Sequence, residues 1–427
     1  MARKMKDSGI EWIGEIPEGW EITRLKYLAD FEPTCDTSYL TDESKITYTP
    51  MECVKNGGFE NRSALYGNLS HTLTPFQNGD IAMAKVTPCF ENGNIAIMDN
   101  LFSGFGLGSS ELFIFRPKSI STRYFFYWLQ NKAFVARACS TMTGTGGLKR
   151  ISPSFIRNCP VHCPSTDEQT KISDYLDAKC SEIDDLLTSV RSSIEEYKKL
   201  KQAIITQAVT KGVRGEREMK DSGVEWAGLV PHHWGVAKIG SIGQTSSGAT
   251  PLRSKESSFF DDATIRWVRT LDLNDGFVYD SSEKITELAL ASSACSIMPK
   301  GTVCVAMYGG AGTIGKCGLL MSDCATNQAV CSIVCNRKIV SPIFLLMQLL
   351  ALKSYWMKYA VGTRKDPNIS QDIVARMKIL IPPLDEQKEI TDHLDAKCAE
   401  IDGLIAKKEQ LVKELESYKK SLIYEVV

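Results

Sequence analysis

The stretch Leu176-Asp177-Ala178-Lys179-Cys180, followed by Glu182-Ile183-Asp184, is the part of the chain from which the fold can be worked out. The same residues return as Leu394-Asp395-Ala396-Lys397-Cys398 and Glu400-Ile401-Asp402. An Asp-Glu-Gln triplet begins each copy, at Asp167 and at Asp385. The copies occupy residues 165–209 and 383–427 and align without a gap.

Both copies place apolar residues on two faces with a seven-residue spacing, which is typical of coiled-coil helices. Because one chain holds two such helices, we expect them to pair with each other as a long antiparallel coiled coil. The alternative is two amphipathic helices in separate bundles, and the two matched seams argue against it. The predicted seam consists of Leu176, Ile183, Leu187, Val190 and Ile194, with Leu394, Ile401, Ile405, Val412 and Leu415.

Four residues interrupt this apolar pattern, namely Tyr197, Lys201, Lys408 and Lys419. Polar residues at seam positions either fix the register of a coiled coil or extend their charged ends to solvent. We therefore expect imperfect pairing at these points.

A second repeat precedes each globular segment. The first Trp motif, residues 5–20, contains Trp12 and Trp20, and its copy at residues 219–234 contains Trp226 and Trp234. We expect these tryptophans to anchor each globular segment against a helix end, with a direct ligand role as the minor alternative. A short polar connector, residues 210–218, joins the two halves.

The globular segments alternate short strand patterns with turns and carry one apolar helix each. Strands are expected at residues 79–84 and 301–306, each followed by a loop rich in glycine. The predicted fold class is α+β, with two mixed α/β globular domains joined by the coiled coil in an internal pseudo-twofold repeat. The predicted boundaries are 1–164, 165–209, 210–218, 219–382 and 383–427.

Composition narrows the class of protein. The formal net charge is −1, but the globular segments are mildly basic and the helices acidic, which favours phosphate partners for the former and protein partners for the latter. The most apolar run, residues 343–352, is too short to span a bilayer, and no signal peptide is expected. We therefore expect a cytoplasmic protein whose 14 cysteines are mostly buried free thiols.

Two glycine-rich loops resemble cofactor-binding sites, but each lacks a residue or motif that such a site requires. Residues 310–316 have the spacing of a phosphate-binding loop, but Cys317 stands where a magnesium-binding Ser or Thr belongs. Residues 102–106 resemble an S-adenosylmethionine loop of DNA methyltransferases, but Pro382-Pro383 cannot supply the motif that orients a target amino group. We predict no nucleotide hydrolysis and no methyl transfer by this chain.

Cysteine and histidine positions do not form a metal site with usual zinc spacing. The candidates are Cys159 to Cys163, with His162 between them, and the pair Cys331 and Cys335. Buried thiols on or beside strands are the preferred interpretation. We predict no catalytic residue, no metal and no cofactor in this chain.

Polar and basic loop residues remain as candidates for contacts to DNA bases and phosphates. For any single residue, a solvated surface charge is an equally good interpretation, but Lys149/Arg150 and Arg364/Lys365 lie in corresponding parts of the two halves. The candidates are Arg62, Lys85, Asn92, Asn94, Lys149 and Arg150, then Arg253, Lys255, Arg269, Lys316, Arg364 and Lys365.

The whole chain resembles the specificity subunit of a type I restriction-modification system. The resemblance rests on Trp12 with Pro17-Glu18-Gly19-Trp20 and its copy, on Pro382-Pro383-Leu384-Asp385-Glu386-Gln387, and on Leu394-Asp395 with Glu400-Ile401-Asp402. Ser165 and Thr166 replace Pro383 and Leu384 in the first copy, which is a small departure.

The resemblance implies two target-recognition domains that each read one half of a split double-stranded DNA site. It also implies that the helices set the spacing and bind methyltransferase subunits, two per chain, with restriction subunits in the full complex. S-adenosylmethionine, ATP and magnesium would belong to those partners. The alternative function is a coiled-coil interaction scaffold without a DNA role; an enzyme is a third, for which no residues are evident.

Overall fold

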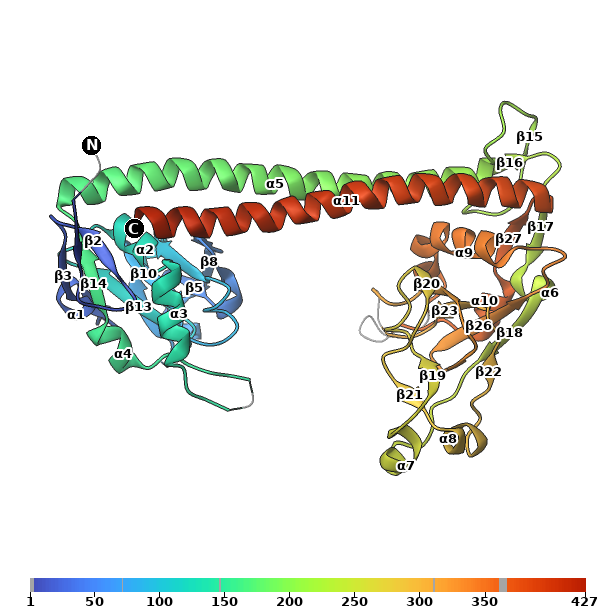
Figure 1. The fold of residues 1–427 in the computed structure, drawn as a ribbon, viewed down its shortest axis with the longest axis horizontal. Helices are drawn as coiled ribbons and strands as arrows, with labels where there is room; N and C mark the ends of the chain where they lie inside the picture. Colours follow the sequence, from blue (N-terminus) through green and yellow to red (C-terminus); the bar gives the residue numbers. More distant parts are fainter. Residues whose placement is uncertain (1–3, 71, 146, 310–311, 361–366) are drawn as a thin grey trace. The chain divides into compact units, whose positions relative to one another are not determined.

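The structure is a computed structural model that describes residues 4–70, 72–145, 147–309, 312–360 and 367–427. The chain forms two compact units, one of residues 1–191 with 410–427 and one of residues 192–409. Each unit contains a globular domain and parts of both long helices (Figure 1). The two units are described in turn.

Two four-stranded sheets build the globular part of the first unit. One has the order β11-β10-β13-β4, with all neighbours antiparallel, and the other has the order β8-β5-β12-β9, with β5 and β12 parallel. Their bounds are β4 Ala29–Phe31, β10 Asp80–Ala84, β11 Ile95–Met98 and β13 Leu112–Pro117, then β5 Lys45–Thr49, β8 Arg62–Leu65, β9 Thr74–Gln77 and β12 Phe105–Gly108.

Strand β10 is buried on both faces because alternate side chains enter different cores. Ile81 and Met83 join the core that contains helix α2 (Thr122–Trp128) and part of α5, whereas Ala82 joins a smaller core with Phe76 of the second sheet. This explains why the strand reads as an unbroken apolar run after Asp80 rather than as an alternating one.

Shorter elements connect this core to the long helix. Strand β14 (Pro160–Cys163) pairs antiparallel with β3 (Glu21–Arg24) and leads directly into α5. The others are β1 Met5–Asp7, β2 Glu15–Pro17, α1 Leu25–Leu28, β6 Val54–Lys55, β7 Gly58–Phe59, α3 Lys132–Ser140 and α4 Pro153–Asn158.

The second unit repeats this topology. One sheet runs β18-β26-β23-β24-β20, which is the first sheet of the other unit in reverse with one strand added, and the other runs β21-β19-β25-β22. Their bounds are β18 Gly243–Ser247, β20 Gly276–Val278, β23 Val303–Ala306, β24 Cys317–Leu320 and β26 Val330–Cys335, then β19 Ile265–Val268, β21 Lys284–Ile285, β22 Ile297–Met298 and β25 Cys324–Thr326.

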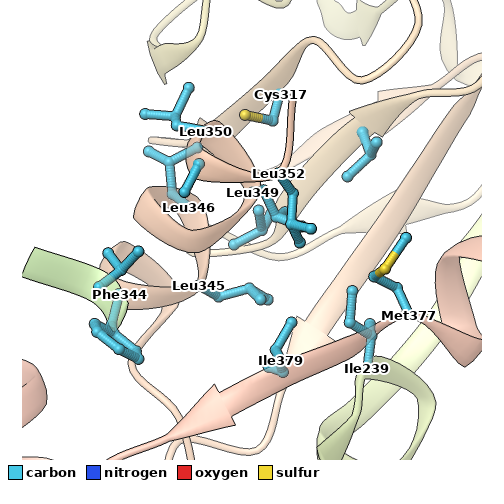
Figure 2. Close-up of a cluster of buried hydrophobic side chains, with 14 of the residues drawn as sticks. Ile239, Cys317, Phe344, Leu345, Leu346, Leu349, Leu350, Leu352, Met377 and Ile379 are labelled. Atoms are coloured by element: carbon cyan, nitrogen blue, oxygen red, sulfur yellow. The ribbon is translucent and has the colours of Figure 1, made fainter. Parts of the chain in front are cut away.

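The apolar helix α9 (Pro342–Ala351) lies at the centre of the main core of this unit (Figure 2). Phe344, Leu345 and Leu349 are fully buried in a cluster that also contains Val303 of β23 and Val209 of α5. Because the helix is covered by a sheet on one side and by a long helix on another, it is apolar over most of its surface. The remaining elements are β15 Met219–Asp221, β16 Leu229–Pro231, β17 Gly235–Lys238, α6 Ile239–Ile242, α7 Glu256–Phe260, α8 Glu287–Ala291, α10 Gln371–Arg376 and β27 Lys378–Ile381.

The two long helices are α5 (Thr166–Lys211) and α11 (Leu384–Val426). In each unit they lie antiparallel, since higher residue numbers of α5 contact lower numbers of α11. Side-chain contacts between them include the ion pairs Asp184–Lys419 and Arg191–Glu416 in the first unit. In the second unit they include the ion pair Lys201–Asp402 and the Lys408 ammonium over the Tyr197 ring. The expected α+β fold with an internal repeat is confirmed.

The predicted seam residues differ in burial. Leu176, Ile183, Leu187, Ile194, Leu394 and Ile401 are buried, whereas Val190, Ile405, Val412 and Leu415 are half-buried. Leu176, Ile183 and Leu187 share the first unit's core with Leu422 and Ile423 of α11. The apolar face of α5 in this unit therefore packs on the globular domain as well as on the partner helix.

Candidate nucleic-acid interface

Each globular domain is attached to its long helix by the Asp-Glu-Gln triplet. In the first unit the indole N–H of Trp20 donates to Glu168 Oε2 at 3.0 Å, and in the second Trp234 donates to Glu386 Oε2 at 3.0 Å. Both tryptophans are buried. They therefore lie where the Trp motifs were expected to anchor a domain against a helix end, and each does so by a charge-assisted hydrogen bond.

The glutamine of each triplet caps a second helix. Gln169 Nε2 donates to Pro164 O at 2.9 Å, and its Oε1 accepts from the backbone N–H of Ser121, which precedes α2, at 2.7 Å. Gln387 makes the equivalent bonds to Pro382 O and from Ser341, which precedes α9. The amide therefore joins the start of α2 or α9 to the backbone that leads into the long helix.

Two basic side chains contact Glu386 in addition to Trp234. Arg217 Nη1 lies 2.9 Å from Glu386 Oε2, and His233 Nε2 lies 2.6 Å from Oε1. Burial alone would raise the pKa of Glu386, but the hydrogen bonds from His233, Trp234 and Arg217 outweigh it and lower the pKa. Arg214 also contacts this carboxylate, so the connector residues 210–218 are held to the start of α11.

Three basic candidates of the first unit meet at one place, the end of β10. Arg150 makes a bidentate pair with Glu111, with Nε to Oε2 at 2.9 Å and Nη2 to Oε1 at 2.7 Å. These bonds lower the pKa of Glu111. Lys85 accompanies the pair, because its backbone N–H donates to Glu111 O at 3.0 Å and its ammonium lies 5.4 Å from the centroid of the Phe113 ring. Exposed Lys149 precedes Arg150 in the chain.

Asn92 and Asn94 belong to the loop that follows the same strand. Asn94 O accepts from the backbone N–H of Ala84, the last residue of β10, at 2.9 Å, and Asn92 is exposed at the tip. Five of the six candidates in the first domain are therefore gathered around one strand end. Polar groups held on a rigid strand end suit a recognition surface.

Arg62 is not part of this group. It lies on β8 and forms a bidentate pair with Glu60 at 2.7 and 2.8 Å, with Glu52 at 4.0 Å on another side. No contact within the described residues joins it to the Lys85, Lys149 and Arg150 group. The sequence alone did not show that Arg62 lies apart from the Lys85, Lys149 and Arg150 group.

The second unit gathers its arginines at a different place. Arg253 and Arg269 both contact the carboxylate of Glu283, each at 2.6 Å. The Arg253 guanidinium lies 4.5 Å from the centroid of Phe260 and 5.6 Å from that of Trp267. Arginines backed by aromatic rings and a carboxylate are fixed in orientation, which lowers the entropy lost on binding a partner.

Lys316 is the only other candidate of this domain whose side chain the structure describes. It is half-buried, and its carbonyl accepts from the backbone N–H of Ala306 at the end of β23 at 2.8 Å. It therefore occupies the place that Asn94 has in the first unit. Lys255 lies in a short 3-10 helix, with its side chain outside the described part, and Arg364 and Lys365 fall outside the described residues.

Backbone bonds show which residues correspond beside the two strand ends. Ile151 N–H donates to Lys85 O, and Ile369 N–H donates to Met307 O. Met307 thus replaces Lys85, and exposed Asn368 takes the position of Arg150. Arg150 therefore corresponds to Asn368 and not, as the sequence suggested, to the Arg364/Lys365 pair. The two halves therefore carry different residues at corresponding places of the same scaffold.

The acidic partners were missed by the sequence reasoning. Glu111, Glu283 and Glu60 orient the arginines, but a search for basic loops does not find them. Glu111 lies 39 positions from Arg150 along the chain. No short motif signals such a pair, and only the fold brings its members together.

The cysteine and histidine candidates for metal lie within the core. His162 is buried, stacks on Trp20 with ring centroids 5.3 Å apart, and contacts the Tyr124 hydroxyl through Nδ1 at 3.2 Å. Burial lowers its pKa to about 4. All 14 cysteines are free and none is exposed. Among the residues that the structure describes, no cluster of three or more His, Cys, Asp or Glu side chains is placed to hold a metal ion.

The two glycine-rich loops have local structural roles where they are described. A Cβ on Gly106 would lie 2.2 Å from Phe76, and one on Gly315 would lie 2.2 Å from Trp356, so both glycines permit close packing. Cys317 is buried on β24. Gly310 and the residue after it lie outside the described part. No helix in the described part of the chain is both long and apolar enough to cross a membrane.

Comparison with known proteins supports a single family. Residues 17–196 and 231–414 match the family described as type I restriction modification DNA specificity domain. The EcoAI type I restriction enzyme specificity subunit of Escherichia coli is 34% identical over 196 residues, which cover 45% of this chain and 33% of that protein. The match with this chain therefore spans about a third of the length of that relative.

Two other proteins match along nearly the whole chain. The MjaVIII specificity subunit of Methanocaldococcus jannaschii is 23% identical, with 96% of this chain and 92% of that protein covered. A chain solved in a study of complex assembly and conformational transition of the type I R-M system has a TM-score of 0.72 at 15% identity, covering 96% and 98%. This second likeness is one of fold.

Proposed function

Because the chain belongs to the family of type I restriction-modification DNA specificity domains, we propose that it selects the DNA sequence on which a type I complex acts. Residues 1–164 and 219–382 are its two target-recognition domains, each reading one half of a bipartite site in double-stranded DNA. The chain itself carries out no chemical step.

One observation above all supports this proposal: two domains of the same topology carry different residues at corresponding strand ends. Lys85 and Arg150 in the first are replaced by Met307 and Asn368 in the second. Base edges in the major groove are distinguished by such hydrogen-bonding groups. Two unlike readers on a repeated scaffold fit an asymmetric, split DNA site.

The long helices have two roles in the proposed function, which are spacing and subunit binding. Residues 165–209 and 383–427 set the distance between the two half-sites and bind methyltransferase subunits, one for each repeat, while restriction subunits join the full complex. S-adenosylmethionine, ATP and magnesium then belong to those partners. The shared attachment through Glu168 and Glu386 supports this arrangement, because it holds each reader to its helix in the same way.

Domain exchange tests the assignment of the half-sites. Residues 235–382 are replaced by the corresponding segment of a family member with a different target, and the chain is expressed with its methyltransferase subunits. Sequencing of methylated sites in the genome is expected to show a change in one half-site only. A change in both half-sites, or the absence of a bipartite motif with the original chain, contradicts the proposal.

Deletion of facing heptads tests the role of the helices. Residues 184–190 are removed together with residues 413–419, which they face through the Asp184–Lys419 pair. Seven residues of helix are about 10 Å long, so the gap is expected to change by on the order of three base pairs while both half-sites persist. Removal of residues 184–190 alone is the control, since it leaves the helices out of register. An unchanged gap after the paired deletion rejects the spacing role.

Binding to DNA separates this function from that of an interaction scaffold. The complex with methyltransferase subunits is expected to bind duplex DNA with an affinity that falls as salt rises, because phosphate contacts release counterions. A scaffold without a DNA role would show no such binding beyond that of the methyltransferase subunits alone.

A further inference from the structure

The backbone around Arg150 is anchored on both sides. Arg150 N–H donates to Thr143 O at 2.8 Å, and Thr143 N–H donates back to Arg150 O at 3.1 Å. Thr87 holds the preceding residue, since its Oγ1 accepts from Lys149 N–H at 2.9 Å and its own N–H donates to Lys149 O at 3.0 Å. Because this backbone is already held by hydrogen bonds, it loses little conformational entropy when the exposed Arg150 side chain binds a ligand.

The guanidinium of Arg150 is oriented by one carboxylate. Glu111 engages the edge formed by Nε and Nη2, and its own backbone is held by the bond from Lys85 N–H to Glu111 O. The opposite edge, formed by Nη1 and the second hydrogen of Nη2, has no partner among the described residues. The side chain is 48% exposed, so this edge can reach a ligand.

An arginine with one free edge has the geometry to recognise guanine. Two parallel N–H donors match the O6 and N7 acceptors of guanine in the major groove, and this is the commonest base-specific contact of proteins with DNA. A carboxylate on the other edge keeps the donors in the plane of the base without competing for them.

Other arginines with carboxylate partners fit this role less well. Arg62 has Glu60 on one side and Glu52 at 4.0 Å from Nη1 on another. Arg269 already uses Nη1 for Glu283 and Nη2 for the hydroxyl of Ser282. Unlike these two arginines, Arg150 combines an anchored backbone with an open edge.

We propose that Arg150 is a specificity residue that recognises one guanine in the half-site read by the first domain, with Glu111 as its positioning residue. This inference rests on the proposed function and deepens it. It assigns one base pair of the target to one side chain. Asn368, at the corresponding position of the second domain, cannot make the same contact.

Sequencing of methylated genomic sites tests the assignment, with the chain expressed together with its methyltransferase subunits. In Arg150→Gln and Arg150→Lys, one G·C position of a single half-site is expected to become degenerate. Discrimination at that position should fall roughly 5- to 150-fold, the range for loss of a bidentate contact. Arg137→Gln, which removes an exposed charge from α3 of the same domain, is the matched control and should leave the motif unchanged.

A separate substitution tests whether Glu111 positions Arg150. Glu111→Gln keeps the shape of the side chain but removes its charge, and it should relax the same base pair and no other. The double variant Arg150→Gln with Glu111→Gln should be no more relaxed than Arg150→Gln alone, because the two residues act as a unit. A purely structural Glu111 would instead lower methylation at all sites equally.

The outcomes separate the inference from the proposed function. A bipartite motif that is identical for the original chain and both Arg150 variants overturns the inference and leaves the function intact. A first half-site without any G·C pair also overturns it. If Arg150→Gln yields no methylation, binding of the Arg150→Lys complex to duplexes that differ at single base pairs decides, and unchanged discrimination there rejects the assignment.

Discussion

The ammonium group of Lys201 on α5 lies 2.7 Å from the carboxylate of Asp402 on α11, and Lys419 has the same relation to Asp184. These two pairs are equivalent under the sequence repeat. Both lysines interrupt the apolar seam, and each finds its partner across the helix pair. A third interruption is resolved in a similar way, since the Lys408 ammonium lies 5.6 Å from the centroid of the Tyr197 ring. The polar seam positions are thus paired, as expected of residues that specify register.

Charge reversal at Lys419 tests this pairing. Lys419→Asp places two carboxylates together and is expected to lower the free energy of unfolding, while the added change Asp184→Lys restores much of it. For an ion pair of this exposure, 15% and 55%, the coupling energy should be about 0.5–1 kcal/mol. Urea unfolding followed by helical circular dichroism measures the four members of the cycle. If the two single substitutions change the free energy of unfolding additively, the ion pair does not stabilise this register of the helices.

The indole of Trp234 is expected to matter more than its size implies. Trp234→Phe removes the donor to the buried carboxylate of Glu386, so it should destabilise the second unit by about 1–3 kcal/mol more than Trp356→Phe. Trp356 is the matched control because it is fully buried but its indole nitrogen has no partner in the described part of the chain. Equal losses in thermal unfolding would contradict the anchoring role.

Buried His162 should make the first unit sensitive to mild acid. Burial lowers its pKa from 6.5 to about 4, so the unfolded histidine takes up a proton at a pH where the folded one does not. The stabilisation is complete above pH 6.5 and is lost as the pH falls towards 4, by at most about 1.4 kcal/mol per pH unit.

Substitution of this histidine provides the check. His162→Gln can retain a hydrogen bond to Tyr124, and it should remove the slope of unfolding free energy between pH 6.5 and 4. His393→Gln, at an exposed position of α11, should leave the slope in place. A slope that survives in His162→Gln would assign the acid sensitivity to other groups.

A comparison of two leucines of α5 distinguishes the contribution of core packing to stability from that of helix propensity. Leu176 is fully buried in the first unit's core, whereas Leu186 on the same helix is 53% exposed. Leu176→Ala should cost about 2–5 kcal/mol, the range for a buried leucine, and Leu186→Ala less than about 1 kcal/mol. Urea unfolding compares the two, and similar losses would mean that Leu176 does not contribute to the core as its burial indicates.

The long helices were predictable because their signal is local. Seven-residue spacing places residues such as Leu176 and Ile183 on one face whatever the rest of the chain does. The predicted start and end of each copy differ from α5 and α11 by no more than two residues. The strand at residues 79–84 was also predictable, since the turn at Gly79 and the apolar run after it are local features.

The sheets and the recognition surface were not predictable to the same degree. Pairing of β5 with β12 joins segments almost 60 residues apart, and the globular segments share too little sequence for their common strand order to be read directly. Sequence reasoning found Arg150 but not Glu111, and it grouped Arg62 with residues that lie elsewhere. Contacts between distant residues depend on how strands pair, which local patterns do not encode.

The sequence by itself determined the repeat, the helices and the family, because each depends on short-range spacing and on motifs such as Asp385-Glu386-Gln387. Only the tertiary structure decided what those motifs do: the glutamate holds a tryptophan from the Trp motif and the glutamine caps a helix of the globular domain. It also decided which arginine has an open edge. The orientation of a guanidinium depends on a carboxylate that folding brings beside it, and that proximity is a property of three-dimensional packing alone.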